Sequence, residues 1–143
     1  MQITVTTAAN LVGTSRRTLR RRMGESMDGT VTLQAIRPQI VIEADDALIL
    51  AADHGDHGAQ TDIAVLLLEA DQPDAAVFWL QRAAVRHPDA MHHLSRCYLD
   101  GLGVPRDVHL AMMWLHKAAA AGHAIALAQA EAILNKGAPR FLA

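Results

Sequence analysis

The sequence predicts a mainly α-helical protein in which antiparallel pairs of helices stack side by side. Short motifs recur along the chain from residue 44 onward, which is the pattern expected of a repeat. Of the 143 residues, 51% are hydrophobic but only 3% are aromatic, so alanine and leucine must supply most of the core. One helical hairpin cannot bury its apolar face alone, and such units therefore stack on one another.

Two kinds of motif recur. A tryptophan followed three residues later by a basic residue and two alanines occurs at Trp79 and again at Trp114. Small residues also correspond between units, because Ala59, Ala90 and Ala126 lie 31 and 36 residues apart. Apolar residues follow the first two of these alanines at i+4, which places them on one helix face.

The segment from residue 90 to residue 122 resembles one complete repeat of the Sel-one-like family, a relative of the tetratricopeptide repeats. The matching positions are Leu94-Ser95, Tyr98, the turn Gly101-Leu102-Gly103-Val104, Asp107, Ala111, Trp114, Lys117-Ala118-Ala119 and Gly122. The 36-residue spacing is similar to the period of that family. The resemblance implies an α-solenoid that binds proteins and rarely catalyses reactions.

We expect the repeat array to cover residues 44–136 as a half repeat, two full repeats and a closing half. Helices are predicted near 44–54, 58–70, 73–86, 89–100, 107–121 and 123–135. Prolines at 73 and 88 suit the first turn of a helix, where a missing N–H costs little, and Asp107 is a good N-cap. Polar residues in the last helix predict a cap, namely Glu131, Asn135 and Lys136. Residues 137–143 are expected to be a tail in which Phe141 could dock on a partner.

The N-terminal segment, residues 1–43, differs from the rest. Its stretch T-T-A-A-N-L-V-G-T-S-R-R-T-L, residues 6–19, resembles a bacterial helix-turn-helix of the MerR and excisionase type. Ala9 is small on the first helix, Gly13 falls at the turn, and Leu19 points inward from the second helix. Five of the 13 basic residues lie between Arg16 and Arg22. The resemblance implies double-stranded DNA as a partner, a homodimer on paired half-sites, and contacts from Ser15, Arg16, Arg17, Arg20 and Arg21.

Two other interpretations of this arginine-rich helix stay open: a solvated helix that packs on the repeats, and a docking helix for RNA or an acidic protein. The segment after it is also ambiguous. A turn at Asp28-Gly29 and β-prone runs near 30–33 and 40–42 would form a wing hairpin, with residues 2–5 as a third strand. Residues 33–37 would alternatively form a helical turn before Pro38.

Charge is segregated along the chain, although the net charge is only −2. No Lys or Arg occurs from Pro38 to Gln81, a span that holds nine acidic residues. This acidic face is either solvated, selective for a basic partner, repulsive to DNA, or a contact for the arginine helix of a second copy. In the resembling repeats the first helix of each pair lines the concave surface. We therefore expect exposed partner contacts at Gln60, Asp62, His92, His93 and Arg96.

Little in the sequence indicates catalysis. No nucleophile lies in a catalytic frame, and two candidate metal ligands, His93 and Cys97, do not make a site without others. We therefore expect no metal and no cofactor. One cysteine excludes an internal disulfide, and neither a signal peptide nor a membrane-spanning run is apparent, which predicts a cytoplasmic bacterial protein.

The predicted function is a non-enzymatic DNA-binding regulator whose repeats bind a protein. The alternative is an adaptor in which the N-terminal segment only caps the array.

Overall fold

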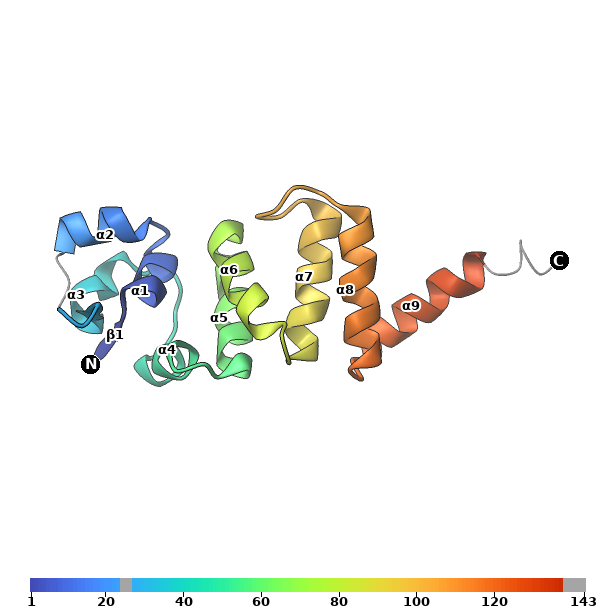
Figure 1. Cartoon of the computed structure of the whole chain (residues 1–143), viewed down its shortest axis with the longest axis horizontal. Helices are drawn as coiled ribbons and strands as arrows, with labels where there is room; N and C mark the ends of the chain where they lie inside the picture. The colour runs from blue at the N-terminus through green and yellow to red at the C-terminus, as the bar shows by residue number, and fades with distance from the viewer. Residues whose placement is uncertain (24–26, 138–143) are drawn as a thin grey trace.

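The computed structural model describes residues 1–23 and 27–137, and its helices follow one another along an elongated molecule (Figure 1). In chain order the elements are β1 (Gln2–Thr4), α1 (Val5–Val12), α2 (Arg16–Met23), β2 (Thr30–Thr32), α3 (Leu33–Ile36), a 3-10 turn (Arg37–Gln39), α4 (Asp46–Asp53), α5 (His57–Glu69), α6 (Pro73–Ala83), α7 (Pro88–Asp100), α8 (Val108–Ala120) and α9 (Ala124–Gly137).

The helices of the repeat array lie where the sequence predicts them, because no observed end differs from its predicted position by more than three residues. Helices α5 and α6 form one pair, α7 and α8 the next, while α4 packs on α5 and α9 on α8. The fold is therefore a stack of helical repeats. Among the described residues, no helix is both long and apolar enough to cross a membrane.

Local signals set these ends. Asp107 caps α8 by accepting a hydrogen bond of 3.0 Å from the Leu110 N–H. Gly101 ends α7 with a φ of 70°, and Gly103 follows with a φ of 71°. A Cβ at Gly103 would lie 2.4 Å from the Pro73 carbonyl oxygen. This glycine is therefore needed both for its backbone angle and for the close approach of the second repeat's turn to α6.

The N-terminal segment has a small sheet in place of a wing hairpin. β1 pairs with β2 in antiparallel register, Gln2 opposite Thr32 and Thr4 opposite Thr30. The run near 40–42 forms no strand in the described part of the chain, so the predicted wing hairpin between residues 30–33 and residues 40–42 is wrong. Residues 33–36 form the alternative helical turn, because this conformation buries Leu33 and Ile36 together in the core.

The N-terminal segment and the array share one hydrophobic core, which runs from Ile3 to Cys97 without interruption. Trp79 is fully buried in it, with the Phe78 ring edge-on at 5.3 Å between centroids. A second, smaller cluster of Leu115, Ala118 and Ala126 joins α8 to α9. The last helix is therefore attached by far less apolar surface than the helices before it.

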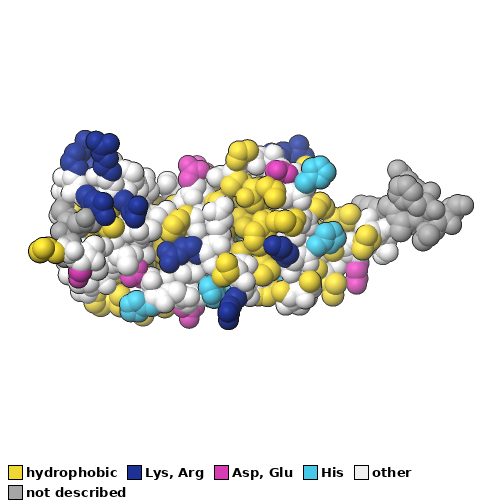
Figure 2. Space-filling view, in the orientation of Figure 1, with side chains coloured by type: hydrophobic (Ala, Val, Ile, Leu, Met, Phe, Trp, Pro, Cys, Tyr) yellow, Lys and Arg dark blue, Asp and Glu magenta, His cyan; other side chains and the backbone are white. Residues whose placement is uncertain are grey.

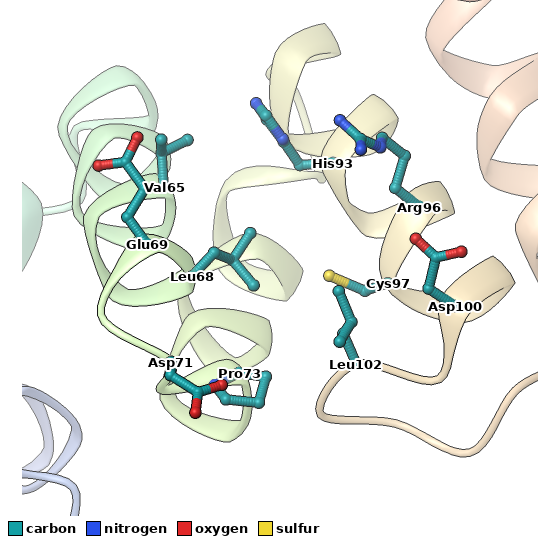
Figure 3. A pocket seen from close by; sticks show the side chains of 10 residues that line it. All are labelled: Val65, Leu68, Glu69, Asp71, Pro73, His93, Arg96, Cys97, Asp100 and Leu102. Carbon is teal, nitrogen blue, oxygen red and sulfur yellow. The ribbon is translucent and has the colours of Figure 1, made fainter.

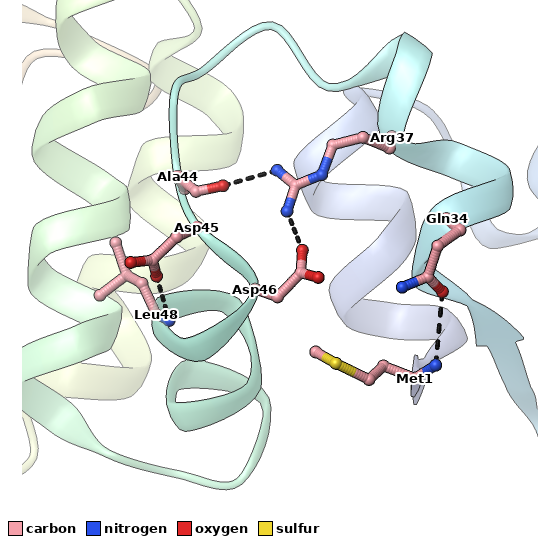
Figure 4. A network of polar contacts seen from close by, with 7 residues as sticks. All are labelled: Met1, Gln34, Arg37, Ala44, Asp45, Asp46 and Leu48. Carbon is pink, nitrogen blue, oxygen red and sulfur yellow. Dashed lines mark hydrogen bonds and ion pairs between the residues drawn. The ribbon is translucent and has the colours of Figure 1, made fainter.

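Polar contacts reinforce the junction between the N-terminal segment and the array. The Asp53 carboxylate, in the last turn of α4, accepts hydrogen bonds from the Thr4 N–H and from the hydroxyls of Thr4 and Thr7. Arg37 forms an ion pair with Asp46 and donates to the Ala44 carbonyl oxygen (Figure 4). Both sets of contacts attach α4 to the preceding segment.

The last helix combines the polar residues of the predicted cap with exposed aliphatic side chains. Glu131 and Asn135 are exposed, as a cap requires. Four aliphatic side chains of α9 are also exposed, however: Ile125, Leu127, Ile133 and Leu134. Polar and aliphatic side chains therefore share the outward side of α9. The predicted contact of Phe141 lies outside the described residues.

Candidate functional site

A groove opens between α5 and α7, the first helices of the two pairs (Figure 3). Its volume is about 360 Å³. The residues that line it come from both helices, from the turns that follow them and from the first residue of α6: Val65, Leu68, Glu69, Asp71, Pro73, His93, Arg96, Cys97, Asp100 and Leu102. We call this surface the α5–α7 groove.

The middle of the groove is apolar. Figure 3 shows Leu68, Cys97 and Leu102 directed toward the space between the helices. Cys97 is 1% exposed, whereas Leu102 is 42% exposed on the turn after α7. An apolar surface of this kind, bordered by polar side chains, is typical of a binding site for another molecule.

The border of the groove carries unbalanced charge. Glu69, Asp71 and Asp100 are exposed carboxylates, and Arg96 is the one cation of the lining. Within residues 1–23 and 27–137, none of these four side chains forms an ion pair or a side-chain hydrogen bond. The groove therefore presents a net negative charge.

The turn between α5 and α6 holds one of these carboxylates in place. Asp71 adopts a left-handed backbone conformation, with a φ of 58°, which aspartate tolerates better than most residues. The Gln72 N–H then donates to the Leu67 carbonyl oxygen, and Pro73 begins α6. This short turn brings Asp71 to the end of the groove where Leu102 and Pro73 lie (Figure 3).

Two groups in the groove have shifted pKa values. Burial lowers the pKa of the His93 imidazole, and the positive charges that His92, Arg96 and His123 contribute lower it further, against an opposing effect of Asp89. Burial also raises the pKa of the Cys97 thiol to about 11. Cys97 is therefore a protonated thiol at neutral pH, and it lacks the reactivity of a thiolate.

The five residues predicted to contact a partner differ in their exposure and in their position relative to the groove. His93 and Arg96 line the groove, and Asp62 is exposed on α5 outside it. The expectation that Gln60 and His92 are exposed is wrong, since they are only 2% and 7% exposed.

Both buried residues join neighbouring helices. The Gln60 amide donates to the Ala52 carbonyl oxygen of α4 at 3.0 Å. The His92 ring stacks on His123 with 4.5 Å between centroids, and its Nε2 lies 2.9 Å from Gln129 Oε1 of α9. A position on the first helix of a pair does not guarantee exposure, because this helix also packs against the preceding and following units.

Sequence reasoning missed several groove residues, among them Leu68, Asp71 and Leu102. They lie at the ends of helices and in turns, away from the helical positions on which partner contacts were expected. For the charged groove residues, the sequence did contain a signal: carboxylates lie close to the predicted helix C-termini. Positive side chains are the ones usually favoured at such positions.

The arginine-rich helix lies at the end of the molecule that holds the N-terminus. The Thr18 N–H donates to Ser15 Oγ at 3.1 Å, so Ser15 caps α2. Gly13 ends α1 in a left-handed conformation, and Leu19 is fully buried. Arginines 16, 17, 20, 21 and 22 are all exposed, and Figure 2 shows basic side chains gathered over α2.

The described residues contain no group of three or more His, Cys, Asp or Glu side chains that could hold a metal ion. His93 and Cys97, which share one helix face, lie in the α5–α7 groove beside Arg96, whose charge would oppose a bound cation.

The family model of the Sel1 repeat matches residues 65–84 and 88–123. The two matches cover the last five residues of α5 and the whole of α6, α7 and α8, and every residue that lines the α5–α7 groove falls within them. Sel1 repeats are a protein–protein interaction module, and this chain carries them in the segment that forms the groove.

Proposed function

We propose that this protein is an interaction adaptor and that its α5–α7 groove binds a partner protein. One observation carries the proposal: an apolar groove, whose border charges form no ion pair with any described residue, lies entirely within the two segments that match the Sel1 repeat. The protonated Cys97 thiol supports binding rather than nucleophilic catalysis at this surface.

A photo-crosslinking experiment in cells tests the location of the partner. The photoreactive residue p-benzoylphenylalanine replaces Arg96 in the groove, or His116 on α8 as an exposed control outside it. We expect one discrete protein adduct with the probe at Arg96 and none at His116. Equal adducts at the two positions, or none at Arg96, would refute a partner in the groove.

We propose as a second candidate that α2 binds double-stranded DNA and that the protein is a regulator. The five exposed arginines of α2 and its start at a capping serine after a tight turn support this function. The core that the N-terminal segment shares with the array supports the alternative, in which this segment only caps the repeats.

DNA binding at several salt concentrations separates these alternatives. Arg16→Ala/Arg17→Ala and the control Arg86→Ala/Lys117→Ala each remove two exposed positive charges. A DNA-binding α2 predicts that only the first variant loses affinity and that its salt dependence becomes shallower by about two units of the log–log slope. Equal effects of the two variants would indicate non-specific attraction, and the capping role would then stand.

A further inference from the structure

The helices that border the groove both end in a negative charge. Glu69 is the last residue of α5, and Asp100 is the last residue of α7. The C-terminus of a helix carries a partial negative charge from its unpaired carbonyl groups, so a carboxylate there is repelled. Neither helix has a basic residue in its last turn.

No cation in the described residues forms an ion pair with Glu69, Asp71 or Asp100. Arg106 donates a hydrogen bond of 3.0 Å from Nε to the Leu99 carbonyl oxygen at the end of α7, but it lies outside the lining of the groove and leaves the Asp100 carboxylate unpaired. Arg96 lies four residues before Asp100 on α7, but the two side chains form no ion pair. Figure 3 shows Arg96 and His93 toward one end of the groove, and Leu102 at the other end between Asp71 and Asp100. A positive charge brought in by a ligand would therefore reach these carboxylates beside an apolar surface.

We propose that the groove selects a partner segment in which an aliphatic side chain stands next to Lys or Arg. The aliphatic side chain packs against Leu68, Cys97 and Leu102, and the cation lies between Asp71 and Asp100. Arg96, at the opposite end, is available to donate hydrogen bonds to carbonyl groups of the partner. This inference rests on the proposed adaptor function and adds the chemistry of the partner.

The test uses the full-length protein and four capped hexapeptides. The peptides are Gly-Ser-Leu-Arg-Ser-Gly and its variants with Leu-Gln, Leu-Glu or Ser-Arg at the centre. Backbone amide signals of residues 68–71 and 97–102 are followed by NMR during titration to millimolar peptide. We expect the Leu-Arg peptide to shift these signals with a Kd at least about fivefold lower than that of the other three.

Paired variants separate charge from folding. Asp71→Asn/Asp100→Asn should weaken binding of the Leu-Arg peptide about fivefold while leaving the thermal stability unchanged or higher, because the repulsion at the helix end is relieved. Asparagine also tolerates the left-handed conformation of Asp71. The control Glu43→Gln/Glu131→Gln removes two exposed carboxylates elsewhere and should leave the Kd within twofold of the wild-type value.

A matched apolar pair tests the middle of the groove. Leu102→Ser should weaken binding of the Leu-Arg peptide, whereas Val85→Ser, at a residue that is 68% exposed outside the groove, should not. Equal affinity for all four peptides, a preference for Leu-Glu, or no shift at millimolar peptide would overturn the proposal. So would concentration-dependent shifts of the same signals without peptide, which would assign the groove to a second copy.

The adaptor function and the preference for a basic-aliphatic ligand are tested separately. An adduct formed through the probe at Arg96, combined with no preference for the Leu-Arg peptide, would retain the adaptor function and reject its basic-aliphatic ligand. Loss of the adduct in the Asp71→Asn/Asp100→Asn variant, but not in the Glu43→Gln/Glu131→Gln control, would support both.

Discussion

His93 shows how the surroundings of one residue link stability to pH. It lies at the border of the α5–α7 groove, half-buried, beside His92 and Arg96 on its own helix and with His123 from the next unit contributing to its environment. Burial and the neighbouring positive charges lower the pKa of its imidazole, and Asp89 opposes them. Folding therefore favours the neutral form of this side chain.

The sign of the pH effect follows from the lowered pKa. The unfolded chain binds a proton at His93 more readily than the folded chain, so the contribution of His93 to stability is present above about pH 6.5 and is lost as the pH falls toward its folded pKa. His93→Gln should therefore reduce the loss of unfolding free energy between pH 7.5 and pH 5 in urea titrations. His116→Gln is the exposed control. An unchanged pH dependence in His93→Gln would contradict this linkage.

Gly103 offers a second prediction at the scale of the residue. Gly103→Ala would place a Cβ 2.4 Å from the Pro73 carbonyl oxygen, in addition to the strain of a left-handed alanine. Gly29 has nearly the same φ but no atom within 4 Å of such a Cβ. We expect a loss of about 3 kcal/mol for Gly103→Ala and about 1 kcal/mol for Gly29→Ala in urea unfolding. Equal losses would show that the close approach to Pro73 is unimportant.

Among the elements, α9 depends on few contacts. Its packing on α8 rests on the small cluster around Leu115, Ala118 and Ala126. The start of α9 is held by His123, whose Nδ1 accepts a hydrogen bond of 3.1 Å from the Ala126 N–H while its Nε2 lies 3.1 Å from the Asp89 carboxylate. His123 thus caps α9 and attaches it to α7.

His123→Ala should remove this cap and raise the hydrogen-exchange rates of amides in α9, with a loss of about 1 kcal/mol in local stability. The amides of α5 should keep their rates, since α5 belongs to the larger core. His116→Ala, which changes an exposed histidine of α8, serves as the control. Faster exchange in α5 as well as α9 would show that the array opens as one unit and not from this end.

At the scale of the whole molecule, the N-terminal segment and the repeats pack around one continuous hydrophobic core. Their shared core and the hydrogen bonds of Asp53 to Thr4 and Thr7 cross the boundary that the sequence suggests near residue 43. Thr7 is fully buried, so its hydroxyl needs the Asp53 carboxylate as a partner. A substitution at this junction should therefore lower the stability of the N-terminal segment and of the repeats together.

Asp53→Asn weakens three hydrogen bonds at the junction and should lower the unfolding free energy by about 1–2 kcal/mol. The fluorescence of Trp79 and Trp114 reports on the array, and we expect it to shift together with hydrogen exchange in α1. Asp62→Asn on the exposed side of α5 should leave both signals unchanged. A shift confined to α1 would identify the N-terminal segment as an independent module.

Interactions between near neighbours in the sequence allowed most of the helices to be predicted. The Asp107 cap, proline at the start of α6 and α7, and left-handed glycines after α1 and α7 all act over a few residues, so their effect is visible without the fold. The recurrence of tryptophan and alanine pairs likewise indicated that the helices would stack.

The tertiary structure decided the contacts between distant segments. The strand near residue 30 pairs with β1 and not with residues 40–42, because the latter continue from a helical turn that buries Leu33 and Ile36. Gln60 and His92 are buried because the neighbouring helices supply partners for their polar groups. The groove likewise combines α5, α7 and two turns, and its charge depends on which carboxylates remain unpaired after packing. The ends of the helices follow from local backbone chemistry. The exposure of side chains and the pairing of strands and charges depend on packing between distant segments, and the proposed binding site depends on that packing.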